Sequence, residues 1–264
     1  MLVVIHPEQE KACEQAARMV ADQVQRKPNS VLGLPTGNSP LAMYSELIRM
    51  HRHYGLDLSR VTTFNLDEYF GLASDHPQSF YRYIHENFLD HVDIAPENAH
   101  IPDGTATDFL MTCSEYESSI KMAGGIDLQI LGIGRTGHIG FNEPTSSLAS
   151  RTRLKTLSDE TIGDNSKISG DIPTVAITMG IATILEAKRI LLLAFGDAKA
   201  EAVAKAIEGP ISSSCSASAL QMHPDVTFIL DGAAAAKLAH RKYYDRVVEQ
   251  TMKFSPERLP LADD

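Results

Sequence analysis

The sequence reads Ile-Asp-Leu-Gln-Ile-Leu-Gly-Ile-Gly-Arg-Thr-Gly-His-Ile-Gly-Phe-Asn-Glu-Pro over residues 126–144, an apolar run followed by a glycine-rich turn. The turn carries His138 and Glu143 and ends at a proline, so two side chains suited to proton transfer follow the end of a strand. Open α/β sheets bind their ligands outside the carboxyl ends of the strands. The stretch therefore predicts a polar site at that edge of a sheet.

Apolar runs alternate with amphipathic segments along the rest of the chain. Runs suited to strands lie at 2–5, 31–34, 61–65, 126–133, 174–178, 190–195 and 226–231, and helical spacing marks 7–27, 40–51, 77–89, 198–207 and 233–248. This alternation is typical of a mainly parallel sheet covered on both faces. We therefore predict an α/β fold, with one doubly wound, Rossmann-like domain over residues 1–264. Residues 144–170 are a candidate lid because they are irregular and rich in Ser, Thr and Asp.

Composition and charge restrict the function classes. With 43% hydrophobic and 22% charged residues the chain resembles a globular protein, and no apolar run reaches the roughly 18 residues of a membrane span. The first residues lack the features of a signal peptide, so we expect a cytoplasmic protein. A net charge of −10 argues against nucleic-acid and membrane partners, and three scattered cysteines argue against disulfides and a sulfur-ligated metal.

A candidate phosphate site joins a strand to a helix over residues 32–40, Leu-Gly-Leu-Pro-Thr-Gly-Asn-Ser-Pro. We expect Asn38 or Ser39 to cap the helix and Pro40 to take its first position. Free backbone N–H groups, two hydroxyls and the helix dipole would favour a phosphate there, although the Gly-Lys-Ser/Thr of a P-loop is absent. An ordinary capped turn is the alternative.

Two further strand ends carry charged side chains. Asp67 and Glu68 follow the run at 61–65, and because consecutive side chains diverge, we expect one of them to face the site. Lys199 follows the run at 190–195, where it would add positive charge for the same phosphate. A solvated acidic loop and a solvated helix lysine are the respective alternatives.

The opening stretch literally satisfies Gly-x-Gly-x-x-Gly at Gly132, Gly134 and Gly137. A dinucleotide site needs a helix to begin within that turn, whereas another glycine and a proline follow within a few residues, so we do not expect dinucleotide binding. The spacing of His138 and Glu143 does not match the i, i+4 face of a zinc helix, so we do not expect a zinc site there. A proton-transfer role suits this pair, and a hydrogen-bonded loop histidine is the alternative.

Four motifs, in this order, resemble the glucosamine-6-phosphate deaminase family over nearly the whole chain. They are Leu-Pro-Thr-Gly-Asn-Ser-Pro at 34–40, Phe-Asn-Leu-Asp-Glu-Tyr-Phe-Gly-Leu at 64–72, Gly-His-Ile-Gly-Phe-Asn-Glu-Pro at 137–144, and Ser-Leu-Ala-Ser-Arg-Thr-Arg-Leu-Lys-Thr-Leu at 147–157. Members convert glucosamine 6-phosphate and water to fructose 6-phosphate and ammonia in amino-sugar catabolism, without a metal or organic cofactor. The resemblance implies the same reaction here.

The resemblance also implies roles for individual residues. Asp67 would carry the proton from C2 to C1 of the sugar, and His138, oriented by Glu143, would open the sugar ring. The phosphate would be held by Thr36, Gly37, Asn38, Lys167 and Lys199. Lys167 stands where relatives often carry arginine, which keeps the charge and loses the bidentate geometry.

Thr136 departs from the family pattern, which often has Asp or Asn two residues before the histidine. A threonine hydroxyl can hydrogen-bond the imidazole, but it cannot stabilise an imidazolium by charge. We therefore expect ring opening to depend on Glu143 and to be slower than with a second carboxylate.

The family also includes hexamers that bind N-acetylglucosamine 6-phosphate between subunits. The matching positions here are Ser146, Arg153, Lys155, Thr156 and Tyr243. The same motif occurs where activation is absent, and the two cations would equally suit a surface pair, so the sequence leaves both activation and the oligomeric state open.

Three other functions stay open at this stage. Galactosamine 6-phosphate is a close alternative substrate, because the epimeric hydroxyl would be recognised by loop contacts that the sequence does not reveal. A sugar-phosphate lactonase on a related fold is disfavoured by the Asp67-Glu68 motif and by the spacing of His138 and Glu143. A non-catalytic sugar-phosphate sensor is disfavoured by the presence of Asp67, His138 and Glu143 together.

Overall fold

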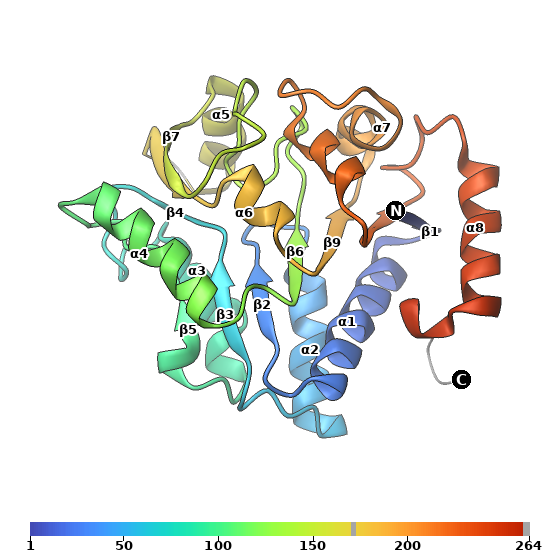
Figure 1. Cartoon of the computed structure of the whole chain (residues 1–264), viewed down its shortest axis with the longest axis horizontal. Coiled ribbons are helices and arrows are strands. Elements are labelled where there is room, and N and C mark those ends of the chain that lie inside the picture. Colours follow the sequence, from blue (N-terminus) through green and yellow to red (C-terminus); the bar gives the residue numbers. More distant parts are fainter. Residues whose placement is uncertain (170–172, 261–264) are drawn as a thin grey trace.

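The computed structural model describes residues 1–169 and 173–260, the side chains of 166–169 excepted. Its centre is a seven-stranded sheet in the order β1-β10-β9-β6-β2-β3-β5, with every strand pair parallel (Figure 1). The strands are β1 (Leu2–His6), β2 (Val31–Leu34), β3 (Thr62–Asn65), β5 (Ala99–His100), β6 (Leu128–Leu131), β9 (Arg189–Ala194) and β10 (Val226–Asp231). The predicted α/β class with a mainly parallel sheet is confirmed.

Helices cover both faces of this sheet because the side chains of its buried strands alternate between two hydrophobic clusters. In β9, Leu191 and Leu193 join the cluster formed with α1 (Gln9–Arg26), α2 (Leu41–Tyr54) and α3 (Phe80–Asn87). Leu192 and Ala194 join the opposite cluster, formed with α4 (Phe109–Met122), α6 (Ile181–Leu185) and α7 (Ala200–Glu208). Helix α8 (Arg241–Phe254) packs beside β1 at one edge of the sheet (Figure 1).

A second, antiparallel sheet was not expected from the sequence. It consists of β4 (Asp67–Tyr69), β8 (Val175–Thr178) and β7 (Arg153–Thr156), in that order. The run at 174–178, which we expected beside the parallel strands, is β8 in the middle of this sheet. Strand β8 therefore lies between β4, which follows β3, and β7, which belongs to the candidate lid.

Several helices differ from the sequence-based expectation. The segment predicted as a helix over 233–248 begins its helix at Arg241, because turns occupy the residues before it. Helix α4 and helix α5 (Asp159–Ser169) were not predicted. The buried stripe of α4, Cys113, Tyr116 and Ile120, has helical spacing and was readable in the sequence. The candidate lid thus contains β7 and the whole of α5, while its last residue, Gly170, lies outside the described residues.

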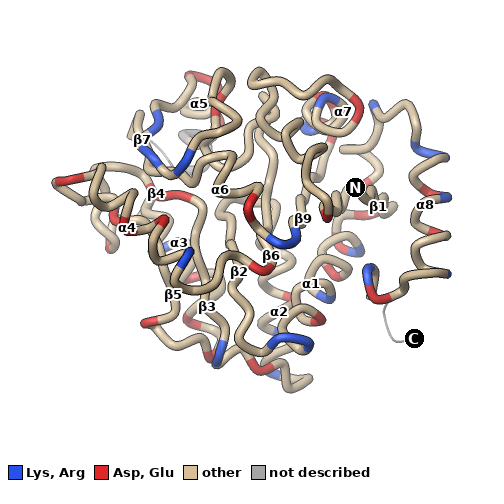
Figure 2. The backbone as a smooth tube through the Cα atoms, in the orientation of Figure 1, with Lys and Arg blue, Asp and Glu red and all other residues tan. Residues whose placement is uncertain are grey.

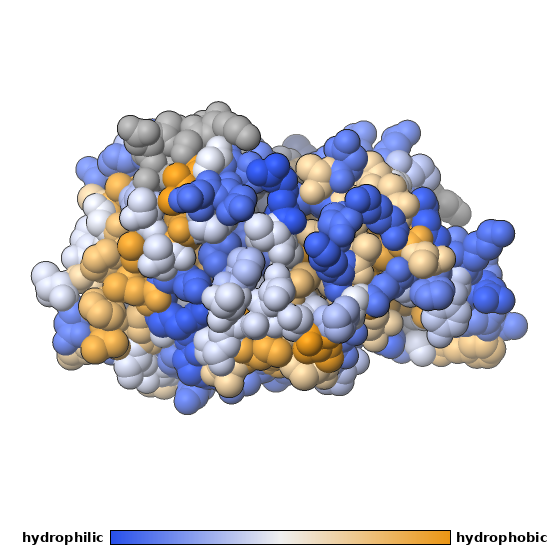
Figure 3. Space-filling view, turned by 90° about the horizontal axis from the view of Figure 1, so that it is seen from above, coloured by the Kyte–Doolittle hydropathy of each residue, from blue (hydrophilic) through white to orange (hydrophobic). Residues whose placement is uncertain are grey.

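The carboxyl ends of β2, β3 and β6 point toward the end of the molecule that carries α5 and β7 (Figure 1). These three strands bear no charged residue, and the charged residues cluster instead on the helices and loops around them (Figure 2). Seen from that end, the surface is largely hydrophilic with scattered apolar groups (Figure 3). Among the described residues, no helix combines the length and apolar character needed to cross a membrane.

Candidate active site

A cavity of about 620 Å³ opens at the carboxyl ends of four parallel strands. Its walls come from the segments that follow β2, β3, β6 and β9, together with parts of α3 and α5. The candidate catalytic and binding residues that line it are Thr36, Gly37, Asn38, Asp67, His138 and Lys199. The structure thus gathers these segments, which are distant in sequence, around one space large enough for a sugar phosphate.

Asp67 begins β4 and lies almost completely buried in the cavity wall. Thr178 is its cross-strand partner on β8, and the Thr178 side chain hydrogen-bonds the carboxyl group. Burial raises the pKa of Asp67 to about 8, with a smaller contribution from the nearby charge of Glu68, and the hydrogen bond to Thr178 opposes both. A buried carboxyl group that titrates near neutral pH is suited to accept and return a proton.

Glu68 points away from the cavity, so the two adjacent carboxylates have different roles. Its oxygens accept hydrogen bonds from the backbone N–H groups of Tyr69, Phe80 and Tyr81, at 2.7–2.9 Å, and from the Ser79 hydroxyl at 2.9 Å. Phe80 and Tyr81 begin α3, where unpaired N–H groups favour a negative charge. Glu68 therefore anchors α3 to β4, and Asp67 alone of the two lines the cavity.

His138 faces the cavity from the turn after β6, and two side chains contact its Nδ1 atom. Thr136 Oγ1 hydrogen-bonds Nδ1 at 2.9 Å, and Glu143 Oε2 lies 3.3 Å from the same nitrogen. The imidazole packs directly on Gly134, where a Cβ atom would stand 2.2 Å from the ring. The absence of a side chain at Gly134 thus lets the ring lie against the backbone.

Glu143 is buried and stays ionised beside His138. Burial opposes its ionisation, but hydrogen bonding to His138, the charge of His138, and hydrogen bonds from Thr161 and Ser158 outweigh that effect and lower its pKa to about 2. The backbone N–H of Ser158 donates to Glu143 Oε1 at 3.2 Å. The contacts from Ser158 and Thr161 connect this carboxylate to the start of α5 within the candidate lid.

The turn after β2 presents its backbone to the cavity. Gly37 has φ 91°, a left-handed conformation that favours glycine, and the Tyr83 hydroxyl donates a 2.5 Å hydrogen bond to its carbonyl oxygen. The expected cap from Asn38 or Ser39 is not formed: α2 begins at Leu41 after Pro40, with no side-chain cap. These two side chains are therefore not committed to capping α2, and both line the cavity.

Two cationic side chains, Arg135 and Lys199, also line the cavity. Burial lowers the pKa of Lys199, Asp164 raises it, and Arg135 lowers it, so the three charged groups interact with one another. Arg135 forms an ion pair with Asp164 of α5 at 2.6 Å. Sequence reasoning missed Arg135 and Asp164, because nothing local connects residues 29 positions apart. The Lys167 side chain, expected to bind phosphate, lies outside the described residues.

The candidate effector residues occupy two distant parts of the chain. Arg153, Lys155 and Thr156 lie on β7, whereas the exposed Tyr243 lies on α8 at the opposite end of the molecule (Figure 1). Ser146 is buried, and its hydroxyl makes no hydrogen bond within the described part of the chain. A site that includes Tyr243 with the others would therefore need a second copy of the chain.

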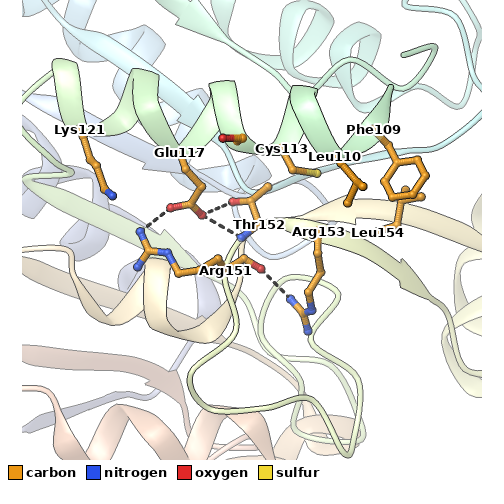
Figure 4. A pocket seen from close by; sticks show the side chains of 10 residues that line it. Phe109, Leu110, Cys113, Glu117, Lys121, Arg151, Thr152, Arg153 and Leu154 are labelled. Atoms are coloured by element: carbon orange, nitrogen blue, oxygen red, sulfur yellow. Dashed lines mark hydrogen bonds and ion pairs between the residues drawn. The ribbon is translucent and has the colours of Figure 1, made fainter. Parts of the chain in front are cut away.

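A second cavity of about 480 Å³ lies between α4 and β7 (Figure 4). Arg151, Thr152 and Glu117 are joined there by hydrogen bonds and an ion pair. Arg153 turns from this cavity toward the turn that follows β6, where its Nη1 donates to Asn142 Oδ1 at 3.0 Å. Within the described residues, no group of three or more His, Cys, Asp and Glu side chains is placed to hold a metal ion.

Comparison with known proteins gives matches over most of the chain. The family model described as glucosamine-6-phosphate isomerases/6-phosphogluconolactonase matches residues 8–229. A glucosamine-6-phosphate deaminase of Shewanella loihica is 47% identical over 250 residues, covering 94% of this chain and 93% of the relative. One from an Arthrobacter species is 51% identical over 247 residues, covering 92% and 95%.

Solved structures agree with these sequence matches. A monomeric glucosamine-6-phosphate deaminase superposes with a TM-score of 0.88 at 46% identity, covering 90% of this chain and all of that one. A 6-phosphogluconolactonase from Trypanosoma cruzi superposes with a TM-score of 0.75 at 20% identity, covering 90% and 97%. At that identity the second likeness shows the fold alone.

Proposed function

Because the chain belongs to the family of glucosamine-6-phosphate isomerases and 6-phosphogluconolactonases, we propose that it converts glucosamine 6-phosphate and water to fructose 6-phosphate and ammonia. The observation that carries this proposal is the meeting of Asp67 and the His138–Glu143 pair at one cavity. An aldose–ketose isomerisation needs both a proton carrier and a group that opens the sugar ring.

Asp67 is the proton carrier in this proposal. As a carboxylate it takes the proton from C2 of the open-chain sugar and returns it to C1, which leaves a C2 imine that water hydrolyses to the ketone and ammonia. Its burial supports this role, because a desolvated carboxylate is a stronger base than one in water.

His138 opens the pyranose ring by transferring a proton between the C1 hydroxyl and the ring oxygen. Glu143 carries the negative charge that stabilises the protonated imidazole during this transfer. Thr136 holds the same nitrogen in place without adding charge. We therefore assign Thr136 an orienting role in ring opening.

The phosphate group binds at the turn after β2 in this proposal. Thr36, Gly37 and Asn38 supply backbone N–H groups and polar side chains close to the start of α2, and Lys199 supplies a positive charge. We propose Lys167 as a further cationic ligand from the candidate lid.

We propose that residues 144–170 act as a lid over the bound sugar. Helix α5 already contributes Thr161, Asp164 and Asn165 to the cavity wall, and Asn165 Nδ2 donates to the Tyr69 hydroxyl at 2.9 Å. Closure would exclude water while the proton moves between carbons. Slower proteolysis within 144–170 when fructose 6-phosphate is present would support this, and unchanged proteolysis would contradict it.

We also propose that a hexamer of this chain is regulated by a ligand that binds between its subunits. Ser146, Arg153, Lys155 and Thr156 would bind N-acetylglucosamine 6-phosphate together with Tyr243 of a neighbouring copy in a hexamer. The test is whether that ligand shifts a sigmoidal rate curve and whether the mass in solution is that of a hexamer. A monomer whose rate curve is unaffected by the ligand would contradict the proposal.

Ammonia release from glucosamine 6-phosphate is the decisive experiment for the catalytic proposal. The wild type should release ammonia and form fructose 6-phosphate, while Asp67→Asn should not. Turnover of galactosamine 6-phosphate and of 6-phosphogluconolactone is measured in parallel. Faster deamination of galactosamine 6-phosphate would reassign the substrate, lactone hydrolysis alone would replace the proposed reaction, and binding without any turnover would favour a sensor.

A further inference from the structure

Three charged side chains from three different segments line the 620 Å³ cavity at the carboxyl ends of the parallel strands. Arg135 belongs to the turn after β6, Asp164 to α5, and Lys199 to the segment between β9 and α7. Arg135 Nε lies 2.6 Å from Asp164 Oδ2, and both charges influence Lys199. Two cations therefore share the space around a single carboxylate of the candidate lid.

We propose that Arg135 is a further ligand of the sugar's phosphate group, and that Asp164 is the counter-ion that Arg135 leaves when the phosphate binds. The inference rests on the proposed function for the identity of the ligand as a sugar phosphate. It adds a binding residue at a position that neither the motifs nor the comparisons identify.

The chemistry of the two anions supports the exchange. A phosphate monoester carries a charge of about −1.5 to −2 near pH 7 and three acceptor oxygens, whereas Asp164 offers one negative charge and two oxygens. A guanidinium group presents its N–H donors in a planar fork that matches either anion. A phosphate could bind Arg135, Lys199 and the turn after β2 at the same time. The Asp164 carboxylate is fixed to α5, so it satisfies only some of these groups.

The position of the ion pair makes the exchange feasible. The Arg135 side chain is 47% exposed and that of Asp164 is 34% exposed, so neither group loses all of its hydration when the pair separates. Exposed ion pairs contribute little net stability, typically about 0–1 kcal/mol. A ligand that binds both cations would therefore separate this pair at small cost.

Two mechanisms predict opposite effects of the Asp164 charge on ligand affinity: competition with the phosphate for Arg135, and a latch that holds α5 closed over the ligand. If Asp164 competes with the phosphate for Arg135, removing its charge strengthens ligand binding. If the Arg135–Asp164 pair instead holds α5 closed over a bound sugar, removing the charge weakens ligand binding. The sign of one measurement therefore separates the two mechanisms.

The experiment measures the dissociation constants of inorganic phosphate and fructose 6-phosphate by calorimetry on the full chain. Arg135→Gln should weaken both by about tenfold or more, as expected for the loss of a charged hydrogen bond. Asp164→Asn should tighten both by severalfold, and the double variant should bind like Arg135→Gln alone. Where activity is present, the KM should follow these changes while kcat changes little.

A matched control uses the Arg82–Glu86 pair on α3, whose Nε–Oε1 distance is also 2.6 Å and whose residues do not line the cavity. Arg82→Gln and Glu86→Gln should leave both dissociation constants unchanged. Thermal unfolding verifies that each variant folds. If Arg135→Gln does not fold, Arg135→Lys is used in its place.

Two results would overturn the inference. Unchanged phosphate binding in Arg135→Gln would show that Arg135 is not a ligand, and weaker binding in Asp164→Asn would identify a latch. Calorimetry is independent of catalysis, so a chain that releases no ammonia yet shows the expected changes with inorganic phosphate would refute the proposed reaction and retain Arg135 as a phosphate ligand.

Discussion

Thr136 Oγ1 lies closer to His138 Nδ1, at 2.9 Å, than Glu143 Oε2 does, at 3.3 Å. The imidazole is thus oriented mainly by a neutral hydroxyl, and the carboxylate that would balance an imidazolium charge lies slightly further away. Orienting the ring and balancing the charge of an imidazolium are thus tasks of two different residues, whereas a carboxylate at position 136 would perform both.

Replacing Thr136 by Asp should therefore accelerate ring opening. The added carboxylate would stabilise the imidazolium by charge as well as by a hydrogen bond, which is stronger when one partner is ionised. We expect the rate to rise severalfold, whereas Thr136→Val should lower it. NMR measurement of anomer interconversion on the enzyme isolates this step, and an unchanged or lower rate in Thr136→Asp would refute the explanation.

Activity should fall below pH 8 because Asp67 must be ionised to act as the base. Its pKa is raised to about 8 by burial and by the charge of Glu68. The pH dependence of kcat/KM reports ionisations of the free enzyme, so its acid limb should lie near pH 8. A limb near pH 4, the ordinary range of an aspartate, would show that burial does not keep Asp67 protonated in the free enzyme.

The raised pKa of Asp67 also predicts that its ionisation lowers the free energy of unfolding, and that Asp67→Asn removes this effect. The unfolded chain loses this proton near pH 4 and the folded chain only near pH 8, so between these values the folded state binds more protons. The stability contributed by this group is present below pH 4 and is lost as the pH rises to 8. Asp67→Asn should therefore unfold at a higher temperature than wild type at pH 8, and the difference should shrink toward pH 4.

The central sheet was predictable because strands β2, β6, β9 and β10 are mostly apolar and almost fully buried. The antiparallel sheet was not, because β4 is Asp-Glu-Tyr and β7 is Arg-Leu-Lys-Thr, which read as polar loops. Only the partner strand β8 is apolar enough to be recognised as a strand from the sequence. Its sequence does not reveal which strands it pairs with.

The candidate site was predictable where its residues lie within motifs or, like Lys199, follow the end of an apolar strand. Asp67, His138 and Glu143 stand in motifs that resemble a known family, and the structure places them around one cavity or directly beside it. The ion pair of Arg135 with Asp164 depends on how α5 packs over the turn after β6, for which the sequence has no local pattern.

Thr178 should tune Asp67 through the hydroxyl group that reaches its carboxylate. Thr178 is fully buried on β8 opposite Asp67, and its hydrogen bond lowers the pKa of Asp67. Thr178→Val removes the hydroxyl at nearly constant volume, so the acid limb of kcat/KM should move to higher pH. At pH 7 the rate should fall by about tenfold, the effect of a one-unit shift. Thr178→Ser should restore the wild-type profile, and a Val variant with an unshifted limb would show that the hydroxyl does not act on Asp67.

Gly140 should tolerate a side chain poorly, because its backbone is left-handed and passes close to the Thr178 hydroxyl beside Asp67. Its φ is 52°, and a Cβ atom there would lie 2.9 Å from Thr178 Oγ1 and 3.4 Å from Asp67 Oδ2. Gly140→Ala should displace the Thr178 side chain that hydrogen-bonds Asp67, and so lower kcat by about tenfold, less than the roughly 100-fold that follows a 1 Å displacement.

Gly124 provides the matched control for this substitution. It has φ 90°, and a Cβ atom added there would meet no atom within 4 Å, so Gly124→Ala adds backbone strain without a clash. Both variants should lose about 1–2 kcal/mol of unfolding free energy through the left-handed conformation. Only Gly140→Ala should lose activity, and equal activities in the two variants would show that close packing at Gly140 does not position the catalytic groups.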